Sequence, residues 1–186
     1  MAFTKVLIAN RGEIACRIMA TAHDLGYRTV AIYSEADSGA PHVQMADQAV
    51  CIGPAPVAES YLNVAAILDA AARTGADAVH PGYGFLAENA DFAKSCADAG
   101  LTFIGPSPQA IELMGNKRLA KLRMEEAEVP CVPGYSGADQ DADVLAAAGE
   151  KIGFPLMVKA ASGGGGRGMR LVAEAADLPA AISGAR

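Results

Sequence analysis

The sequence has no long apolar run and no basic stripe, and no secretory signal is visible in it. A membrane-spanning helix needs about 20 consecutive, mostly apolar residues, and no stretch approaches that length. The start, Met1 to Lys5, lacks the charged region and the long apolar stretch of a signal peptide. The net charge of −6, with acidic and basic residues interspersed, disfavours nucleic acid as a partner. We therefore expect a protein that binds neither membrane nor nucleic acid.

Cysteine pairs with metal-ligand spacing are also lacking. The four cysteines stand singly, with no CxxC, at Cys16, Cys51, Cys96 and Cys131. Their simplest interpretation is as small apolar residues in a reducing compartment, with zinc or disulfides as the alternatives. We accordingly expect a cytoplasmic protein.

The composition and the apolar pattern are those of a soluble α/β domain. Hydrophobic residues make up 52% and charged residues 19% of the chain. Residues 5–9 form an apolar run typical of a buried strand, residues 13–25 repeat apolar side chains every three or four positions, and residues 29–33 form a second strand. Such a βαβ unit implies parallel strands.

The alternation continues along the chain as far as Ile104. Further strands are expected at residues 49–52, 78–80 and 101–104, with helices at 62–72 and 89–99. We therefore predict a Rossmann-like open parallel sheet. Gly105 to Pro108 then break the pattern, and helices follow at residues 108–114 and 117–126. Two strands at residues 156–159 and 169–172 are expected to flank a glycine-rich loop.

That loop contains four consecutive glycines, Gly163, Gly164, Gly165 and Gly166, followed by Arg167, Gly168 and Met169. It matches GxGxxG, but a strand is expected after it instead of the helix that a dinucleotide fingerprint requires. A Walker loop fails as well, because Met169 stands in the place of its lysine. The pattern favours a flexible hairpin flap over nucleotide phosphates. A plain surface turn is the alternative.

Two lysines are candidates for binding phosphate. Lys159 ends an apolar strand immediately before the glycine loop, so its ammonium group is expected to face phosphate oxygens. Lys117 opens a predicted helix, and from the sequence pattern alone an exposed helix lysine is the simpler interpretation.

The stretch from His80 to Asn89 begins at the carboxyl end of a predicted parallel strand, where ligands of open α/β sheets usually lie. Tyr83, Glu88 and Asn89 give it polar groups, although a structural turn with a helix cap is an equally good interpretation. The segment Asn10–Glu13 occupies the place of a dinucleotide fingerprint but has a single glycine, which disfavours NAD binding.

Five stretches together resemble the biotin carboxylase component of biotin-dependent carboxylases. They read IANRGEIA (residues 8–15), HPGYGFLAEN (80–89), FIGP (103–106), MGNK (114–117) and KAASGGGGRGM (159–169). The resemblance extends over nearly the whole chain. It implies a biotin carboxylase N-terminal domain at residues 1–115 and the beginning of an ATP-grasp domain at residues 116–186.

The resemblance also implies an activity and a set of site residues. MgATP would activate bicarbonate, which then carboxylates biotin on a carrier protein. ATP-binding residues would be Lys117, Lys159, Gly163, Gly164, Gly165, Gly166, Arg167, Gly168 and Met169. Tyr83, Gly84 and Glu88 would lie at the biotin and bicarbonate end. The expected partners are a biotin carboxyl carrier domain, a carboxyltransferase subunit and, at full length, further copies of the chain.

The family's ATP-grasp domain continues beyond the position of Arg186, and its magnesium ligands lie in that later part. We therefore assign no metal ligand and no catalytic residue here, and we expect the 186-residue chain alone not to turn over ATP. An acyl-CoA carboxylase is the favoured context. The alternatives are the same module of pyruvate or urea carboxylase, another ATP-grasp ligase, or a non-catalytic module for dimerisation or nucleotide binding.

Overall fold

The computed structural model describes residues 3–160 and 168–185. The chain divides into two compact units, Met1–Glu112 and Leu113–Arg186. Each unit has its own hydrophobic core.

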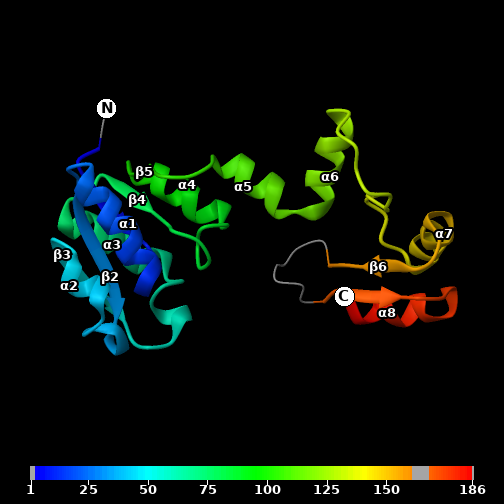
Figure 1. The fold of residues 1–186 in the computed structure, drawn as a ribbon, viewed down its shortest axis with the longest axis horizontal. Helices are drawn as coiled ribbons and strands as arrows, with labels where there is room; N and C mark the ends of the chain where they lie inside the picture. The colour runs from blue at the N-terminus through cyan, green and yellow to red at the C-terminus, as the bar shows by residue number, and fades with distance from the viewer. Residues whose placement is uncertain (1–2, 161–167, 186) are drawn as a thin grey trace. The chain divides into compact units, whose positions relative to one another are not determined.

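A five-stranded parallel sheet forms the first unit, as predicted, with the order β3-β2-β1-β4-β5 (Figure 1). The strands are β1 (Lys5–Ile8), β2 (Arg28–Ser34), β3 (Gln48–Gly53), β4 (Ala78–His80) and β5 (Thr102–Phe103). The helices are α1 (Gly12–Asp24), α2 (Pro41–Met45), α3 (Val64–Thr74) and α4 (Ala90–Asp98), with 3₁₀ turns η1 (Glu35–Asp37) and η2 (Val57–Glu59). Helix α5 (Pro108–Gly115) follows β5.

Alternating side chains of the strands supply two cores, one on each face of the sheet. Leu7 packs in the same cluster as Ile67 of α3 and Phe92 of α4. Its neighbours Val6 and Ile8 point to the opposite face and pack with α1. Because both faces are covered, the strands read as continuous apolar runs in the sequence.

Local signals set the helix ends. The side-chain oxygen of Asn89 accepts a hydrogen bond from the Phe92 amide at 2.8 Å, so Asn89 caps α4 as its position predicts. Asn63 caps α3 in the same way through the Ala66 amide at 3.1 Å. These two side chains therefore mark where the loops end and the helices α3 and α4 begin.

The second unit is built on an antiparallel pair of strands, β6 (Leu156–Val158) and β7 (Arg170–Val172), in which Val158 lies opposite Arg170. Its helices are α6 (Lys117–Glu126), α7 (Ala142–Ile152) and α8 (Leu178–Ala185), with a 3₁₀ turn η3 (Ala175–Asp177). Val172 of β7 packs with Leu178 and Ile182 of α8 to form its core. Strands are thus confirmed on both sides of the glycine-rich segment, as predicted.

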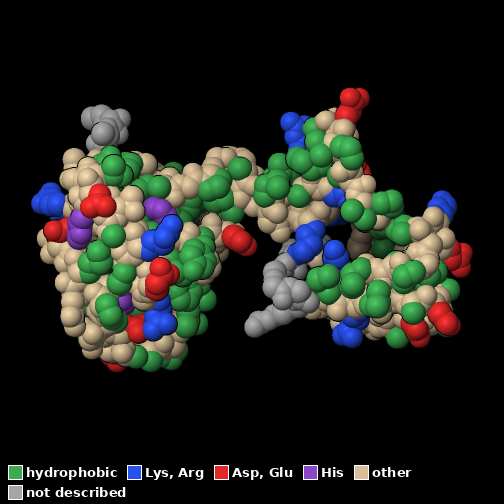
Figure 2. Space-filling view, viewed as in Figure 1, with side chains coloured by type: hydrophobic (Ala, Val, Ile, Leu, Met, Phe, Trp, Pro, Cys, Tyr) green, Lys and Arg blue, Asp and Glu red, His purple; other side chains and the backbone are tan. Residues whose placement is uncertain are grey.

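Charged side chains of both signs are interspersed over the visible face of the first unit (Figure 2). Among the described residues, no helix is both long and apolar enough to cross a membrane.

Replacing Leu7 with alanine should lower the free energy of unfolding of the first unit by roughly 2–5 kcal/mol, because the side chain is fully buried. The matched control is Leu25→Ala, whose side chain is 68% exposed and should cost less than about 0.5 kcal/mol. Urea denaturation followed by tyrosine fluorescence measures both, since four of the five tyrosines lie in the first unit. Equal losses in the two variants would contradict the packing described.

Candidate functional site

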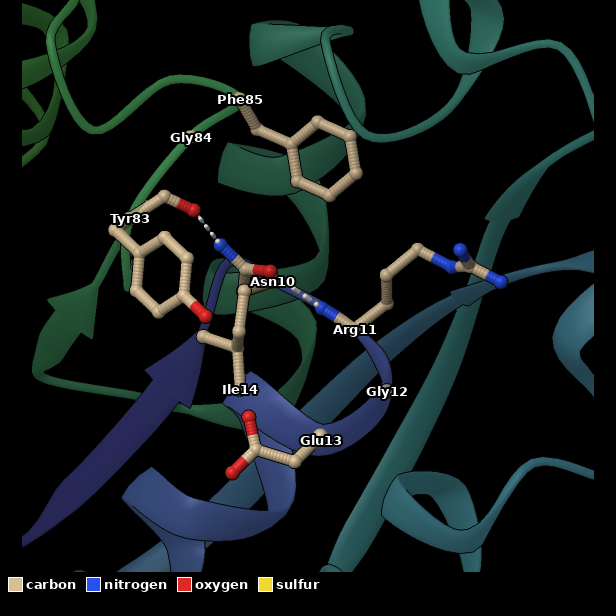
Figure 3. A pocket seen from close by; sticks show the side chains of 8 residues that line it. All are labelled: Asn10, Arg11, Gly12, Glu13, Ile14, Tyr83, Gly84 and Phe85. Carbon is tan, nitrogen blue, oxygen red and sulfur yellow. Dashed lines mark hydrogen bonds between the residues drawn. The ribbon is translucent and has the colours of Figure 1, made fainter.

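The sheet has a topological switch point between β1 and β4. The chain runs from β1 to β2 and β3 on one side and returns to β4 and β5 on the other. Ligands of open α/β sheets usually bind outside the carboxyl ends of the strands at such a point. An open pocket of about 510 Å³ lies here (Figure 3). Its lining residues come from the segments that follow the two strands: Asn10, Arg11, Gly12, Glu13, Ile14, Tyr83, Gly84 and Phe85.

The side-chain amide of Asn10 joins these two segments. Its nitrogen donates hydrogen bonds to the backbone carbonyls of Pro81 and Tyr83, both at 2.9 Å. Its oxygen accepts the backbone N–H of Arg11, also at 2.9 Å. The side chain is 1% exposed, and both amide hydrogens have an acceptor, so burial of this polar group is fully compensated.

Gly82 lets the two segments approach closely. Its φ of +66° lies in the left-handed region. A Cβ at this position would lie 2.7 Å from the Asn10 amide nitrogen and 2.9 Å from Cγ2 of Ile14. Glycine is therefore required both by the backbone conformation and by the space available.

Phe85, at the rim of the pocket, has an unusual backbone. Its φ of +43° is rare for a bulky residue and costs about 1–3 kcal/mol unless other contacts hold it. Its ring stacks on Tyr61, with centroids 5.2 Å apart and planes 7° from parallel. Phe85 also lies in a turn that is closed by the hydrogen bond from the Ala87 amide to the Gly84 carbonyl at 2.9 Å.

Arg11 is held by Asp37 of η1. Nε of Arg11 donates to Oδ2 of Asp37 at 2.7 Å, and a second guanidinium nitrogen donates to Oδ1. In Figure 3 the guanidinium extends away from Tyr83. The bonds from Arg11 lower the pKa of Asp37 to about 2, and further hydrogen bonds from Tyr61 and Ser34 act in the same direction.

Two histidines near the pocket are shifted towards their neutral forms. His42 is fully buried, and desolvation lowers its pKa. Its Nδ1 accepts the Gly12 amide at 3.4 Å, while Nε2 lies 3.3 Å from the Ile32 carbonyl, which assigns the proton to Nε2. Burial also lowers the pKa of His80, whose Nδ1 accepts the Gly82 amide at 3.0 Å. Both rings thus act as hydrogen-bond acceptors for loop amides.

Of the three residues predicted for biotin and bicarbonate, two line the pocket and one does not. Tyr83 and Gly84 line the pocket, and the Tyr83 side chain is 67% exposed. Glu88 is exposed in the same β4–α4 segment but is not among the lining residues. Arg11, Phe85 and the buried Asn10 also lie at the pocket, and the sequence patterns predicted no site role for them.

The predicted nucleotide-binding residues lie in the second unit. Lys159 directly follows β6, and Met169 directly precedes β7. Each is therefore next to the Val158–Arg170 pair at the end of the two strands. Lys117 is the first residue of α6, after the Asn116 cap. Gly168 is described beside Met169, whereas Gly163, Gly164, Gly165, Gly166 and Arg167 fall outside the described residues. Within residues 3–160 and 168–185, no three His, Cys, Asp or Glu side chains are grouped to hold a metal ion.

Comparison with known families gives two adjoining matches. Residues 2–111 match the model of the biotin carboxylase N-terminal domain. Residues 116–186 match the ATP-binding domain of the carbamoyl-phosphate synthase L chain.

Individual relatives agree with these matches. The chain is 59% identical over 177 residues to the methylcrotonoyl-CoA carboxylase subunit alpha of Oryza sativa, covering 95% of this chain and 24% of that protein. It is 54% identical over 169 residues to the propionyl-CoA carboxylase alpha chain of Rattus norvegicus, covering 91% and 23%. The chain thus spans about a quarter of the length of these curated relatives.

A solved structure resembles the entire chain. The biotin carboxylase domain of 2-oxoglutarate carboxylase from Hydrogenobacter thermophilus has a TM-score of 0.94 and 49% identity, and the match covers 100% of this chain and 41% of that one. That domain was solved as a dimer in complex with MgADP, ADP and bicarbonate.

Asn10→Asp should lower the free energy of unfolding by about 3 kcal/mol or more, because an oxygen would replace the nitrogen that faces two carbonyls and a buried charge would be unpaired. Asn63→Asp is the matched control. The Asn63 side chain uses its oxygen to cap α3, and aspartate caps equally well, so a change below about 0.5 kcal/mol is expected. Urea denaturation of both variants is the measurement, and equal stability would contradict the role of the Asn10 nitrogen.

Asp37→Asn should destabilise the chain by about 1–2 kcal/mol at pH 7, after allowance for the half-exposed Arg11 partner. The folded-state pKa of Asp37 lies below its unfolded value, so its contribution is present above about pH 4 and is lost as pH falls towards 2. The unfolding free energies of wild type and variant should therefore converge over that range in a pH series. A difference that stays constant down to pH 2 would show that the charge is not responsible.

Proposed function

The chain belongs to the biotin carboxylase N-terminal domain family, and on that premise we propose that it is the front part of an ATP-dependent biotin carboxylase. The proposed reaction is the carboxylation of biotin on a carrier protein, with MgATP and bicarbonate as substrates. It would be the first half-reaction of an acyl-CoA carboxylase.

One observation carries the proposal. A biotin carboxylase domain match over residues 2–111 is followed directly by an ATP-binding domain match over residues 116–186, so the two together account for nearly the whole chain in one order. The two curated relatives, at 59% and 54% identity, are both acyl-CoA carboxylase subunits, which favours that context.

The described residues suit the nucleotide end of this reaction. Lys159 and Lys117 supply ammonium groups for phosphate oxygens, and transfer of a phosphoryl group depends mainly on such positioning and charge neutralisation. Bound MgATP supplies the phosphoryl group that activates bicarbonate. Gly163 to Gly168 are proposed as the flap, with Met169 at the adenine side.

In the first unit, Tyr83, Gly84 and Glu88 are assigned to biotin and bicarbonate. Support comes from the place of Tyr83 and Gly84 in the pocket at the switch point of the sheet. We assign no metal ligand to this chain.

A carrier domain, a carboxyltransferase subunit and self-association are proposed for the full-length protein, as is a cytoplasmic location. The likeness to a 2-oxoglutarate carboxylase makes a 2-oxo acid carboxylase, such as pyruvate carboxylase, the second candidate. Assays of the carboxylated product with acyl-CoA and with 2-oxo acid acceptors separate the two.

The test is phosphate release by the full-length protein with ATP, bicarbonate and free biotin. We expect release that requires both biotin and bicarbonate, and Lys159→Ala should lower kcat/KM for ATP by roughly ten-fold or more, since a charge-assisted phosphate contact is lost. Lys151→Ala, at the exposed end of α7, is the matched control and should leave it unchanged.

The same assay on the 186-residue chain alone should show no turnover. Absence of phosphate release by the full-length protein would refute the proposed function and favour a non-catalytic nucleotide-binding module, and release that does not require biotin would also refute it. Turnover by the chain alone would refute the expectation that the groups needed for catalysis lie outside it.

A further inference from the structure

One carboxylate connects several loops at the carboxyl edge of the sheet. Asp37 Oδ2 accepts Nε of Arg11 at 2.7 Å, the hydroxyl of Tyr61 at 2.6 Å and the hydroxyl of Ser34 at 3.1 Å. These three donors lie after β1, in the segment between β3 and α3, and at the end of β2. The Asp37 side chain is 12% exposed. The loops that follow three neighbouring strands are thus cross-linked at one point.

Tyr61 extends this connection to the loop after β4. It is 2% exposed, and its hydroxyl accepts the Ser34 amide at 3.0 Å while donating to Asp37. Its ring stacks on Phe85, and the guanidinium carbon of Arg11 lies 5.8 Å from its centroid. Tyr61 therefore contacts two residues that line the pocket, although it does not line the pocket itself.

We propose that Asp37 and Tyr61 are positioning residues for the biotin end of the proposed site, acting through Arg11 and Phe85. Asp37 fixes the direction of the Arg11 side chain, and Tyr61 provides the flat surface that keeps Phe85 in its left-handed conformation. Arg11 lines the pocket from the segment after β1 and Phe85 lines it from the segment after β4, so their placement affects both sides of the pocket (Figure 3). That biotin is the ligand rests on the proposed function, whereas the contacts of Asp37 and Tyr61 do not depend on it.

A carboxylate network at the opposite edge of the sheet provides the comparison. Asp77 precedes β4 and accepts the backbone amides of Thr4 at 2.9 Å and Lys5 at 2.7 Å, at the start of β1. It joins β1 to β4 at their amino ends. It contributes nothing to the pocket lining. Comparing Asp37→Asn with Asp77→Asn therefore separates an effect on the stability of the fold from an effect on the placement of the pocket residues.

The kinetic test uses the full-length protein with free biotin as substrate. Asp37→Asn and Tyr61→Leu should each raise KM for biotin by roughly ten-fold, because displaced pocket residues lose the productive geometry, with KM for ATP within about two-fold of wild type. Tyr61→Phe is the matched control, because it removes only the hydroxyl and keeps the ring that stacks on Phe85. It should therefore raise KM for biotin less than Tyr61→Leu does. Asp77→Asn should reduce stability and leave both KM values unchanged. A wild-type KM for biotin in Asp37→Asn or in Tyr61→Leu would overturn the proposal for that residue, and parallel rises in these variants and Asp77→Asn would overturn it for both.

Hydrogen exchange tests the geometry independently of activity. The amides of Gly82 and Ala87 are bonded within the β4–α4 segment, to His80 Nδ1 at 3.0 Å and to the Gly84 carbonyl at 2.9 Å. In Asp37→Asn their exchange should accelerate several-fold, and in Asp77→Asn it should not. Unchanged exchange in Asp37→Asn would overturn the positioning role. Faster exchange in a protein without biotin-dependent phosphate release would instead retain that role and refute the proposed function.

Discussion

The buried amide of Asn10 is the contact on which the pocket depends. Parallel strands place the ends of β1 and β4 side by side, but strand pairing stops at Ile8 and His80. Beyond that point the backbone must find other partners. Asn10 supplies them, since its nitrogen bonds two carbonyls of the neighbouring segment and its oxygen bonds the next amide of its own. The absent side chain of Gly82 leaves the space that this arrangement requires.

The two edges of the sheet use charge differently. At the amino edge, Asp77 and Asp47 accept backbone amides at the starts of β1 and β2, and the pKa of each is lowered. At the carboxyl edge, Asp37 accepts side-chain donors from separate loops. The first arrangement anchors strands, whereas the second orients side chains that border a cavity. This difference follows from the parallel sheet. The loops at its amino edge are short connections from helix to strand, whereas the loops at its carboxyl edge surround the switch point.

Much of the fold could be predicted from the sequence because its signals are local. The apolar runs of β1 and β2 and the cap at Asn89, which binds an amide three residues ahead, are examples. The role of Asn10 could not be predicted, because its two acceptors are 71 and 73 residues away along the chain. The pairing of Tyr61 with Asp37 and Phe85 is similarly non-local. The short helix α2 was missed because five residues are too few to show a helical period. A place for Tyr83 near the carboxyl end of a strand could be predicted because its segment follows β4, whereas the roles of Tyr83, Gly84, Glu88, Lys117 and Lys159 stay predictions.

The strained turn at Phe85 has a thermodynamic consequence. Since stacking on Tyr61 already fixes this residue in the folded chain, and Asn10 fixes the segment beside it, a ligand entering the pocket meets a wall whose backbone is ordered beforehand. The ordering entropy that a flexible loop would lose on association is then largely absent. The heat-capacity change of binding at this pocket should accordingly reflect the apolar surface covered, with little contribution from coupled folding.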